Sequence, residues 1–171
     1  VTGAVNLILA DGCTLNVEKG IVVPSDASLT IYAQSDGSGT LNATGTADSD
    51  NASAGIGGST SSLDSGTITI HGGEIKATGG LVNDNFGNPN YGGAGIGGGS
   101  PNSGNGGSSG TVTIYGGTVT ANSGAGSITG AGIGGGGGDN GGTGSNITIY
   151  GGNVIAESHG TSNGGSGAGI G

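Results

Sequence analysis

The tetrapeptide Ala-Gly-Ile-Gly occurs four times in this chain, at residues 54–57, 94–97, 131–134 and 168–171. Its starting positions, 54, 94, 131 and 168, are separated by 40, 37 and 37 residues. A fixed period of roughly 20 to 50 residues is typical of architectures in which one supersecondary unit stacks on the next. The tetrapeptide therefore predicts a repeat protein.

Two further segments recur between the copies of the tetrapeptide. The first alternates polar and aliphatic residues and ends in Gly-Gly, at residues 67–73, 111–117 and 146–152. The second follows at once and points an aliphatic residue and then an alanine to one side, at residues 74–77, 118–121 and 153–156. Alternation with a period of two predicts short strands with one buried face, and the Gly-Gly pair lets the backbone turn between them.

Three short strands per repeat, none of which can bury its apolar face alone, predict the coil of a parallel β-helix. We expect an all-β fold, a right-handed parallel β-helix (solenoid) of about five three-faced coils with glycine-rich corner loops. The hand follows from the general rule for parallel connections. The sequence predicts one domain over residues 1–171, and we expect it to be a piece of a longer protein. The predicted coils are a compact one at 5–28 and longer ones at 29–58, 66–98, 111–135 and 146–171.

The repeats predict which aliphatic side chains stack inside. The first face should stack Leu29, Ile68, Val112 and Ile147 beside Ile31, Ile70, Ile114 and Ile149; the second, Leu41, Ile75, Val119 and Val154 beside Ala43, Ala77, Ala121 and Ala156; the third, Ile56, Ile96, Ile133 and Ile170. In the compact first coil we expect Leu7 and Leu9 on the first face, Leu15 and Val17 on the second, and Val22 on the third.

The composition restricts the possible partners. The chain has 47 glycines among 171 residues and no Trp or Met, so branched aliphatics and alanine must fill a thin core. A formal charge of −9 disfavours nucleic acid as a partner, because an acidic surface repels phosphates. No apolar run approaches the roughly 20 residues that span a bilayer, so membrane insertion is not expected.

With these motifs in view, the chain resembles a class of bacterial repeat domains. The resemblance rests on residues 7–15 and 28–32 and on the repeated Gly-Ala-Gly-Ile-Gly and Thr-Ile-Thr-Ile-x-Gly-Gly motifs. Such domains occur in large secreted or cell-wall-attached proteins and are described as carbohydrate-binding or pectate-lyase-like β-helix domains. The resemblance implies an extracellular, cell-surface module that contacts glycans or host surface proteins, and it supplies no catalytic residues to carry over.

The few aromatic side chains are the candidate ligand-binding residues. One equivalent position beside the Gly-Gly corner holds a flat ring in four repeats, and sugars stack on such rings; these residues are Tyr32, His71, Tyr115 and Tyr150. The alternative is a structural ladder that caps the strand ends. Phe86 and Tyr91 lie in the longest insert, residues 79–93, where they could form a small exposed contact patch.

Two other patterns suggest sites of different chemistry. Asp48, Asp50 and Asn51 place two carboxylates and an amide in one loop, which suits calcium, although ordinary turn chemistry explains the same residues. We expect no other cofactor. Outward threonine pairs, such as Thr67 and Thr69, are similar to the threonine ranks of ice-binding solenoids, but we expect Asn146 and Lys76 to interrupt them.

Catalysis is not expected. Polysaccharide lyases and hydrolases use clustered carboxylates or a basic side chain, whereas Lys19 and Lys76 are the only basic Lys or Arg residues here. Glu74 and Lys76 should form a solvated ion pair on one strand. We therefore predict a non-catalytic adhesion or glycan-binding module. The alternatives are an accessory part of a polysaccharide-active enzyme (a lyase or hydrolase) and a purely structural stalk, and the coils could stack end to end with further coils or copies.

Overall fold

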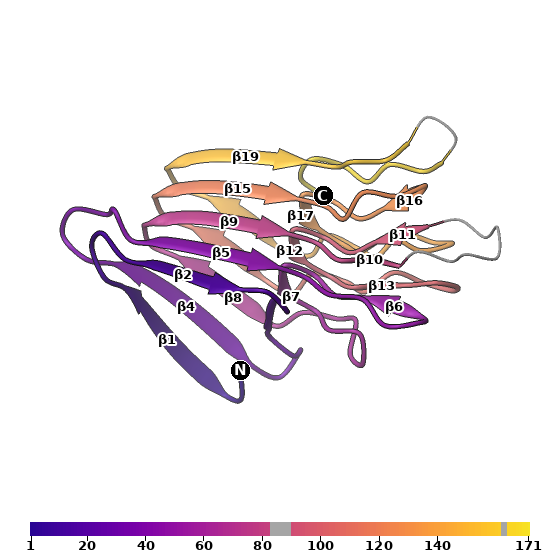
Figure 1. The fold of residues 1–171 in the computed structure, drawn as a ribbon, viewed down its shortest axis with the longest axis horizontal. Helices are drawn as coiled ribbons and strands as arrows, with labels where there is room; N and C mark the ends of the chain where they lie inside the picture. The colour runs from indigo at the N-terminus through magenta and orange to yellow at the C-terminus, as the bar shows by residue number, and fades with distance from the viewer. Residues whose placement is uncertain (83–89, 162–163) are drawn as a thin grey trace.

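The computed structural model describes residues 1–82, 90–161 and 164–171, and within these ranges the chain forms strands and loops without a helix (Figure 1). Three parallel sheets each take one strand from successive repeats. The prediction of an all-β chain built on parallel sheets is confirmed. Over the same ranges, no helix has the length and apolar character needed to cross a bilayer.

The first sheet contains the strictly alternating segments. Its strands follow the chain order: β1 (Ala4–Leu9), β4 (Ser28–Ala33), β8 (Thr67–Ile70), β14 (Val112–Ile114) and β18 (Ile147–Ile149). Every neighbouring pair is parallel. In β8 the side chains of Ile68 and Ile70 are fully buried while Thr67 is exposed, as an alternating strand with one buried face requires.

The second sheet begins after the Gly-Gly corner. Its strands are β2 (Thr14–Val17), β5 (Thr40–Thr44), β9 (Glu74–Thr78), β15 (Thr118–Asn122) and β19 (Asn153–Glu157). All of its pairs are parallel. Ile75 and Val119 stack inside the sheet, and Ala77 and Ala121 stack beside them, all four buried.

The third sheet is made of the Ile-Gly part of the tetrapeptide. Its strands are β3 (Ile21–Val22), β7 (Ile56–Gly57), β12 (Ile96–Gly97) and β17 (Ile133–Gly134), and Ile170 forms a parallel bridge to Ile133. Gly97 has φ +133°, and a Cβ atom there would overlap the carbonyl oxygen of Gly134. The tetrapeptide therefore needs glycine for both its conformation and its close backbone approach.

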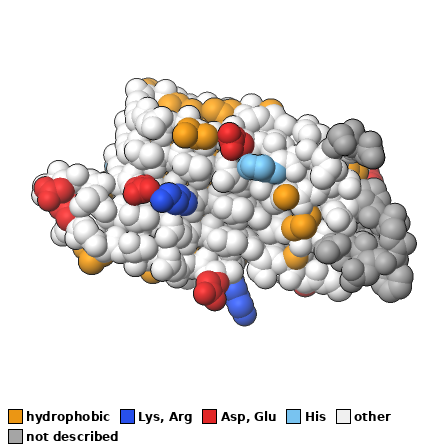
Figure 2. All heavy atoms as spheres, turned by 45° about the horizontal axis from the view of Figure 1, so that its top comes forward, with side chains coloured by type: hydrophobic (Ala, Val, Ile, Leu, Met, Phe, Trp, Pro, Cys, Tyr) orange, Lys and Arg blue, Asp and Glu red, His pale blue; other side chains and the backbone are white. Residues whose placement is uncertain are grey.

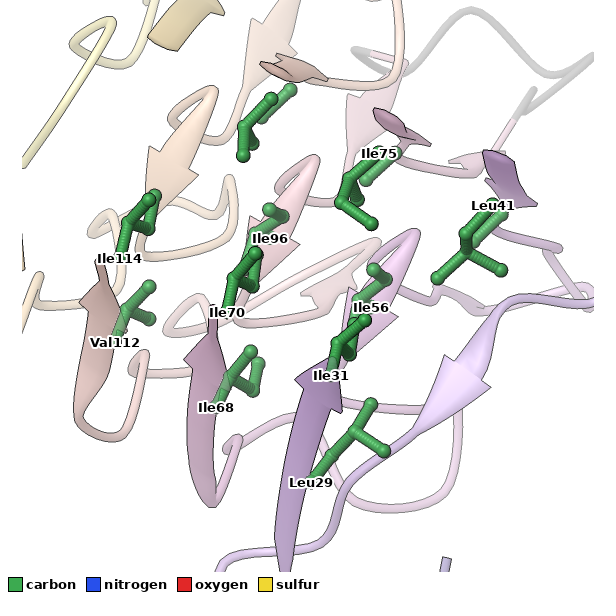
Figure 3. Packing of buried hydrophobic residues seen from close by; sticks show 14 of the residues in the cluster. Leu29, Ile31, Leu41, Ile56, Ile68, Ile70, Ile75, Ile96, Val112 and Ile114 are labelled. Atoms are coloured by element: carbon green, nitrogen blue, oxygen red, sulfur yellow. The ribbon is translucent and has the colours of Figure 1, made fainter. Parts of the chain in front are cut away.

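The stacked aliphatic side chains of the three sheets meet in one core (Figure 3). Strand pairing places the residues of the long repeats in the predicted ladders. Ile31, Ile75 and Ile96 are each fully buried and come from the first, second and third sheets. The core is thin and continuous along the stack, because branched aliphatics and alanine are the side chains available to fill it.

In the compact first repeat, Leu7 and Leu9 both face the core from β1, as predicted, but their register against the next strand differs from the expected one. Val5 pairs with Leu29 and Leu7 with Ile31, so the first face is shifted by two residues from the Leu7 and Leu9 expected. A two-residue shift keeps the same face inward, and alternation alone does not distinguish the registers. Leu9 is buried at the corner, and its side chain occupies the space next to Gly39 and Gly73. A side chain at either glycine would overlap Leu9.

On the third face of that coil, Ile21 rather than Val22 pairs with Ile56. The next residue but one, Val23, is fully buried, so residues 21 and 23 point inward and Val22 does not. A two-residue strand has too few positions to show a period. The predicted second face is confirmed, with Leu15 paired to Leu41 and Val17 to Ala43.

The inserts around the tetrapeptide contain short strands where only loops were expected. β6 (Asn51–Ala52) pairs with β13 (Ser100–Pro101) antiparallel, β10 (Leu81–Val82) pairs with β11 (Tyr91–Gly92) antiparallel, and β11 pairs with β16 (Ile128–Thr129) parallel. Ala52, Val82 and Tyr91 are buried there. Figure 1 shows these strands at the end of the long axis opposite to the Gly-Gly corners.

Candidate functional site

Four aromatic rings form one stacked column at the corner between the first and second sheets. The ring centroids of Tyr32 and His71 are 4.7 Å apart, those of His71 and Tyr115 are 4.8 Å apart, and those of Tyr115 and Tyr150 are 4.9 Å apart. The planes of successive rings differ by 3°, 2° and 9°. The structure thus brings together the four residues that the repeat pattern placed at equivalent positions.

The column is built by the backbone ladder of the first sheet. The N–H groups of His71, Tyr115 and Tyr150 each donate to a carbonyl one strand away, on Ile31, Ile70 and Ile114 respectively, at 2.8 Å in every case. These bonds hold each ring one strand spacing from the next, which is about 4.8 Å and close to a stacking distance. The ladder spacing therefore sets the ring spacing.

A Gly-Gly pair follows His71, Tyr115 and Tyr150, and it lets the chain leave the sheet sharply. Gly117 has φ +92°, and a Cβ atom there would lie 2.6 Å from the carbonyl oxygen of Gly73 in the preceding repeat. A side chain at this corner would therefore separate the repeats and with them the rings. The second sheet begins immediately afterwards, with Thr118.

The column has a fifth member, which is aliphatic and not aromatic. Ile8 pairs with Tyr32, faces outward and is 64% exposed, so it extends the line of rings by one apolar side chain. The signal for it is the alternation of Leu7, Ile8 and Leu9, which places Ile8 on the opposite face from its neighbours. We call the five residues Ile8, Tyr32, His71, Tyr115 and Tyr150 the aromatic column.

Stacking determines which parts of the rings a ligand can reach. Each inner ring has neighbouring rings against both of its faces, so the accessible parts are the ring edges with their hydroxyl or imidazole nitrogen atoms. Tyr115 is 48% exposed and Tyr150 is 69% exposed. Tyr150 stacks on Tyr115 with one of its faces, and it is the most exposed of the three tyrosine rings.

A polar groove of about 460 Å³ lies beside the column. Its walls are the loop of residues 34–38 and the Gly-Gly corners. Its polar side chains are those of Gln34, Ser35, Asp36, Ser38, His71, Glu74 and Thr118. The turn after β1 holds the loop in place. The N–H of Asp36 donates to Asp11 Oδ2 at 3.1 Å, and the N–H of Gly12 donates to Ser38 Oγ at 3.0 Å.

An exposed ion pair stands on the second sheet near the groove. Lys76 Nζ lies 2.6 Å from Glu74 Oε1, and both side chains are about half exposed. The hydrogen bond and the positive charge of Lys76 lower the pKa of Glu74. The predicted solvated ion pair is confirmed, and on the face drawn in Figure 2 lysine side chains lie beside acidic ones among mostly uncharged surface.

Tyr91 belongs to a different region and is not exposed. Only 3% of it is accessible, and its hydroxyl donates a hydrogen bond to Asp139 Oδ1 at 2.8 Å. Burial and the contact with Asp139 raise the pKa of Tyr91. The expectation of an exposed contact residue at Tyr91 is therefore wrong, because the insert folds back as β10 and β11 and buries the ring. Phe86, its predicted companion, lies outside the residues that the structure describes.

The proposed calcium loop is closed by its own hydrogen bonds. Asp48 Oδ1 accepts from the N–H groups of Asp50 and Asn51 at 2.9 and 2.8 Å, and Ser49 Oγ donates to Asp50 Oδ2 at 2.9 Å. The two backbone donors lower the pKa of Asp48. This is the Asx-turn arrangement that the alternative interpretation predicts. Within residues 1–82, 90–161 and 164–171, no three His, Cys, Asp or Glu side chains gather as metal ligands would.

Comparison of the chain with protein-family models, with curated proteins and with solved structures finds no match. The candidate functional site consists of the aromatic column and the groove beside it. Strands β11, which contains Tyr91, and β6, which contains Asn51, lie at the other end of the long axis (Figure 1). The hydrogen bonds of Tyr91 and of Asp48 belong to the local structure of these inserts.

Proposed function

We propose that this chain is a right-handed parallel β-helix (solenoid) that serves as a non-catalytic extracellular module of a bacterial surface protein. The strand order supports the first part: in all three sheets, successive repeats add successive parallel neighbours. Such a stack presents the same side-chain position repeatedly along one line, which is how solenoid proteins build extended binding surfaces. The ligands that we propose are glycans, free or on host surface proteins.

The aromatic column is the observation that carries this proposal. An exposed row of tyrosine and histidine edges offers hydroxyl and imidazole groups at a regular spacing of 4.7 to 4.9 Å. Sugars have many hydroxyl groups that pair with such donors and acceptors, and their apolar faces pack on exposed aromatic surface. The groove beside the column adds side-chain amide, hydroxyl and carboxylate groups.

Binding to a glycan array, followed by calorimetry on the best ligand, tests the proposal. We expect Tyr150→Ala and Tyr115→Ala to weaken binding about tenfold or more, since each removes ring contacts worth roughly 1–2 kcal/mol. Ile155→Ala is the matched control, because Ile155 is 45% exposed on the second sheet. Release of reducing ends or unsaturated products would contradict a non-catalytic role. A glycan array on which nothing is bound would favour the alternative function, a purely structural stalk.

We also propose that the open strand edges accept further coils or copies. β18 and β19 are the last strands in the order of their sheets, and Ile155 and Ile170 near them are about half exposed. An unpaired edge with apolar side chains is a template for another strand. Sedimentation of the chain over a range of concentrations tests this, and a monomer at every concentration would contradict association of copies.

A further inference from the structure

The outward side of the first sheet carries no charged carboxylate or ammonium group. We call this surface the outer face and define it by the outward residues of the five strands and their flanks: Ala4, Asn6, Ile8, Ser28, Thr30, Tyr32, Thr67, Thr69, His71, Thr111, Thr113, Tyr115, Asn146, Thr148 and Tyr150. Charged residues make up 8% of the chain, and none of the Asp, Glu or Lys side chains is on this surface.

The charged side chains on described strands lie in the second sheet. They are those of Glu74, Lys76 and Glu157, in β9 and β19. Lys76 is paired with Thr120 of β15 and not with any threonine of the outer face. The expectation that Lys76 interrupts the threonine ranks is therefore wrong, because the Gly-Gly corner places it on another sheet.

The threonines of the outer face form a register-matched rank. Thr30 pairs with Thr69, Thr69 with Thr113, and Thr113 with Thr148. The rank repeats at the strand spacing of about 4.8 Å, and the aromatic column runs parallel to it about 6.7 Å away along each strand. The outer face thus presents a line of hydroxyl groups beside a line of ring edges, with Thr67 and Thr111 exposed on the other side of the threonine rank.

We propose that the outer face is the glycan-binding surface and that it selects neutral glycans whose chain lies along the threonine rank. This inference rests on the proposed function and assigns the ligand class and the docking surface. A threonine hydroxyl both donates and accepts, so it pairs with a sugar hydroxyl in either orientation. An uncharged partner covers this face without stripping water from any charge, which would otherwise oppose binding.

The charge of the chain disfavours the other glycan classes on this face. A uronic acid chain meets the repulsion of a protein with a formal charge of −9. An amino sugar polymer would be drawn instead to the groove, where Asp36 and Glu74 supply carboxylates. Neutral glycans are therefore the class whose hydroxyl groups match the hydroxyl groups of the outer face and not the carboxylates of the groove.

Calorimetry with the double variant Thr69→Val, Thr113→Val tests the inference. The measurement uses one neutral, one uronic acid and one amino sugar polymer with the full chain. Valine keeps the β-branched shape and removes two hydroxyls, so we expect the fold to persist and neutral-glycan affinity to fall roughly tenfold or more. Thr120→Val is the matched control on β15 of the second sheet, where we expect no change; far-UV circular dichroism checks that both variants fold.

Several outcomes would overturn the inference, and the first two leave the proposed function standing. If the double variant binds neutral glycans as wild type does and Tyr115→Ala loses this binding, the threonine rank is not the docking surface but the chain still binds glycans. Preference for the amino sugar polymer, lost in Glu74→Gln, moves the site to the groove. Failure of the chain to bind any glycan removes the proposed function, and inhibition of ice recrystallisation that the double variant loses would assign the rank to ice.

Discussion

The imidazole ring of His71 lies 4.8 Å from the phenol ring of Tyr115, with the two planes within 2° of parallel. Tyr32 stacks on the other side of His71 at 4.7 Å, so the imidazole is enclosed between two phenol rings. This arrangement supports both interpretations that the sequence left open, since the rings stabilise one another through their faces and present their edges to solvent. A structural role predicts that ring variants lose stability, and a binding role predicts that they lose ligand affinity.

Denaturant unfolding measures how much the stacking of the rings contributes to the free energy of unfolding. Tyr115→Ala removes ring contacts on two sides, and Tyr150→Ala removes one. At about 0.5–1.5 kcal/mol per aromatic pair, we expect the Tyr115 variant to lose roughly twice the unfolding free energy that the Tyr150 variant loses. Equal losses in the two variants would show that the stacking contributes nothing measurable.

A charge in the third ladder should unfold the stack. Ile96 is fully buried and paired on both sides, to Ile56 and Ile133. Ile96→Asp buries a carboxylate without a partner, so we expect a loss above about 3 kcal/mol in the free energy of unfolding, measured by thermal or denaturant melts. Ile155→Asp places the same change on an exposed strand position, and similar losses in both variants would refute the ladder.

Glycine-to-alanine variants separate two effects at the tetrapeptide, namely the conformational effect of a positive φ and the steric effect of close backbone approach. Gly97→Ala meets both a φ of +133° and the carbonyl oxygen of Gly134, whereas Gly104→Ala meets a φ of +93° in open space. Gly141→Ala meets neither and is the neutral control. We expect a loss of about 1–3 kcal/mol for Gly104→Ala, a larger loss for Gly97→Ala and no loss for Gly141→Ala in thermal melts. The reverse order would contradict the close approach.

The contact between Tyr91 and Asp139 predicts two pH limits. The N–H of Gly104 and the hydroxyl of Tyr91 lower the pKa of Asp139 from its ordinary value of 3.8, so its contribution to stability is present at neutral pH and is lost as the pH falls through the lowered value. The pKa of Tyr91 is raised, so its contribution is present below pH 10 and is lost as the pH rises through the raised value.

Melting temperatures of wild type and Tyr91→Phe across the pH range test these limits. We expect the variant to melt lower at neutral pH and the difference to shrink at both extremes, because the hydrogen bond requires a protonated phenol and an ionised carboxylate. A constant difference at every pH would show that lost packing, and not this hydrogen bond, explains the variant.

Removal of divalent metal should not change the melting temperature. The oxygen Oδ1 of Asp48 is already occupied by the N–H groups of Asp50 and Asn51. We expect identical melts with EDTA and with added calcium, and a lower melting temperature for Asp48→Ala in both solutions because the turn loses its acceptor. A calcium-dependent rise in wild type that Asp48→Ala abolishes would restore the calcium site.

Strand positions were predictable where a residue type recurs at a fixed distance. Ile68, Ile114 and Ile149 follow from alternation and repetition, and so does the equivalence of His71 with Tyr115. The residues before β4 lack the repeated motifs, and Leu9 among them packs against Gly39 and Gly73 of later repeats. That contact is long-range, so no local pattern indicates it.

The candidate site was predictable in its members and not in its geometry. Equivalent positions identify Tyr115 and Tyr150, but the sequence does not say whether two such rings lie face to face or side by side. The burial of Tyr91 depends on its partner Asp139, 48 residues away in a glycine-rich insert. Composition alone assigns such an insert to loops, since its strands are two residues long.

Parallel pairing of every strand in the first sheet also determines how the molecule responds to mechanical load. Each strand bonds only to its neighbours in the order β1, β4, β8, β14 and β18. A pull from β1 toward β18 acts along the interstrand hydrogen bonds, so it breaks one ladder at a time and not all together. We expect the stack to lengthen in successive low-force steps, so that a load on one repeat is relieved before the next repeat opens.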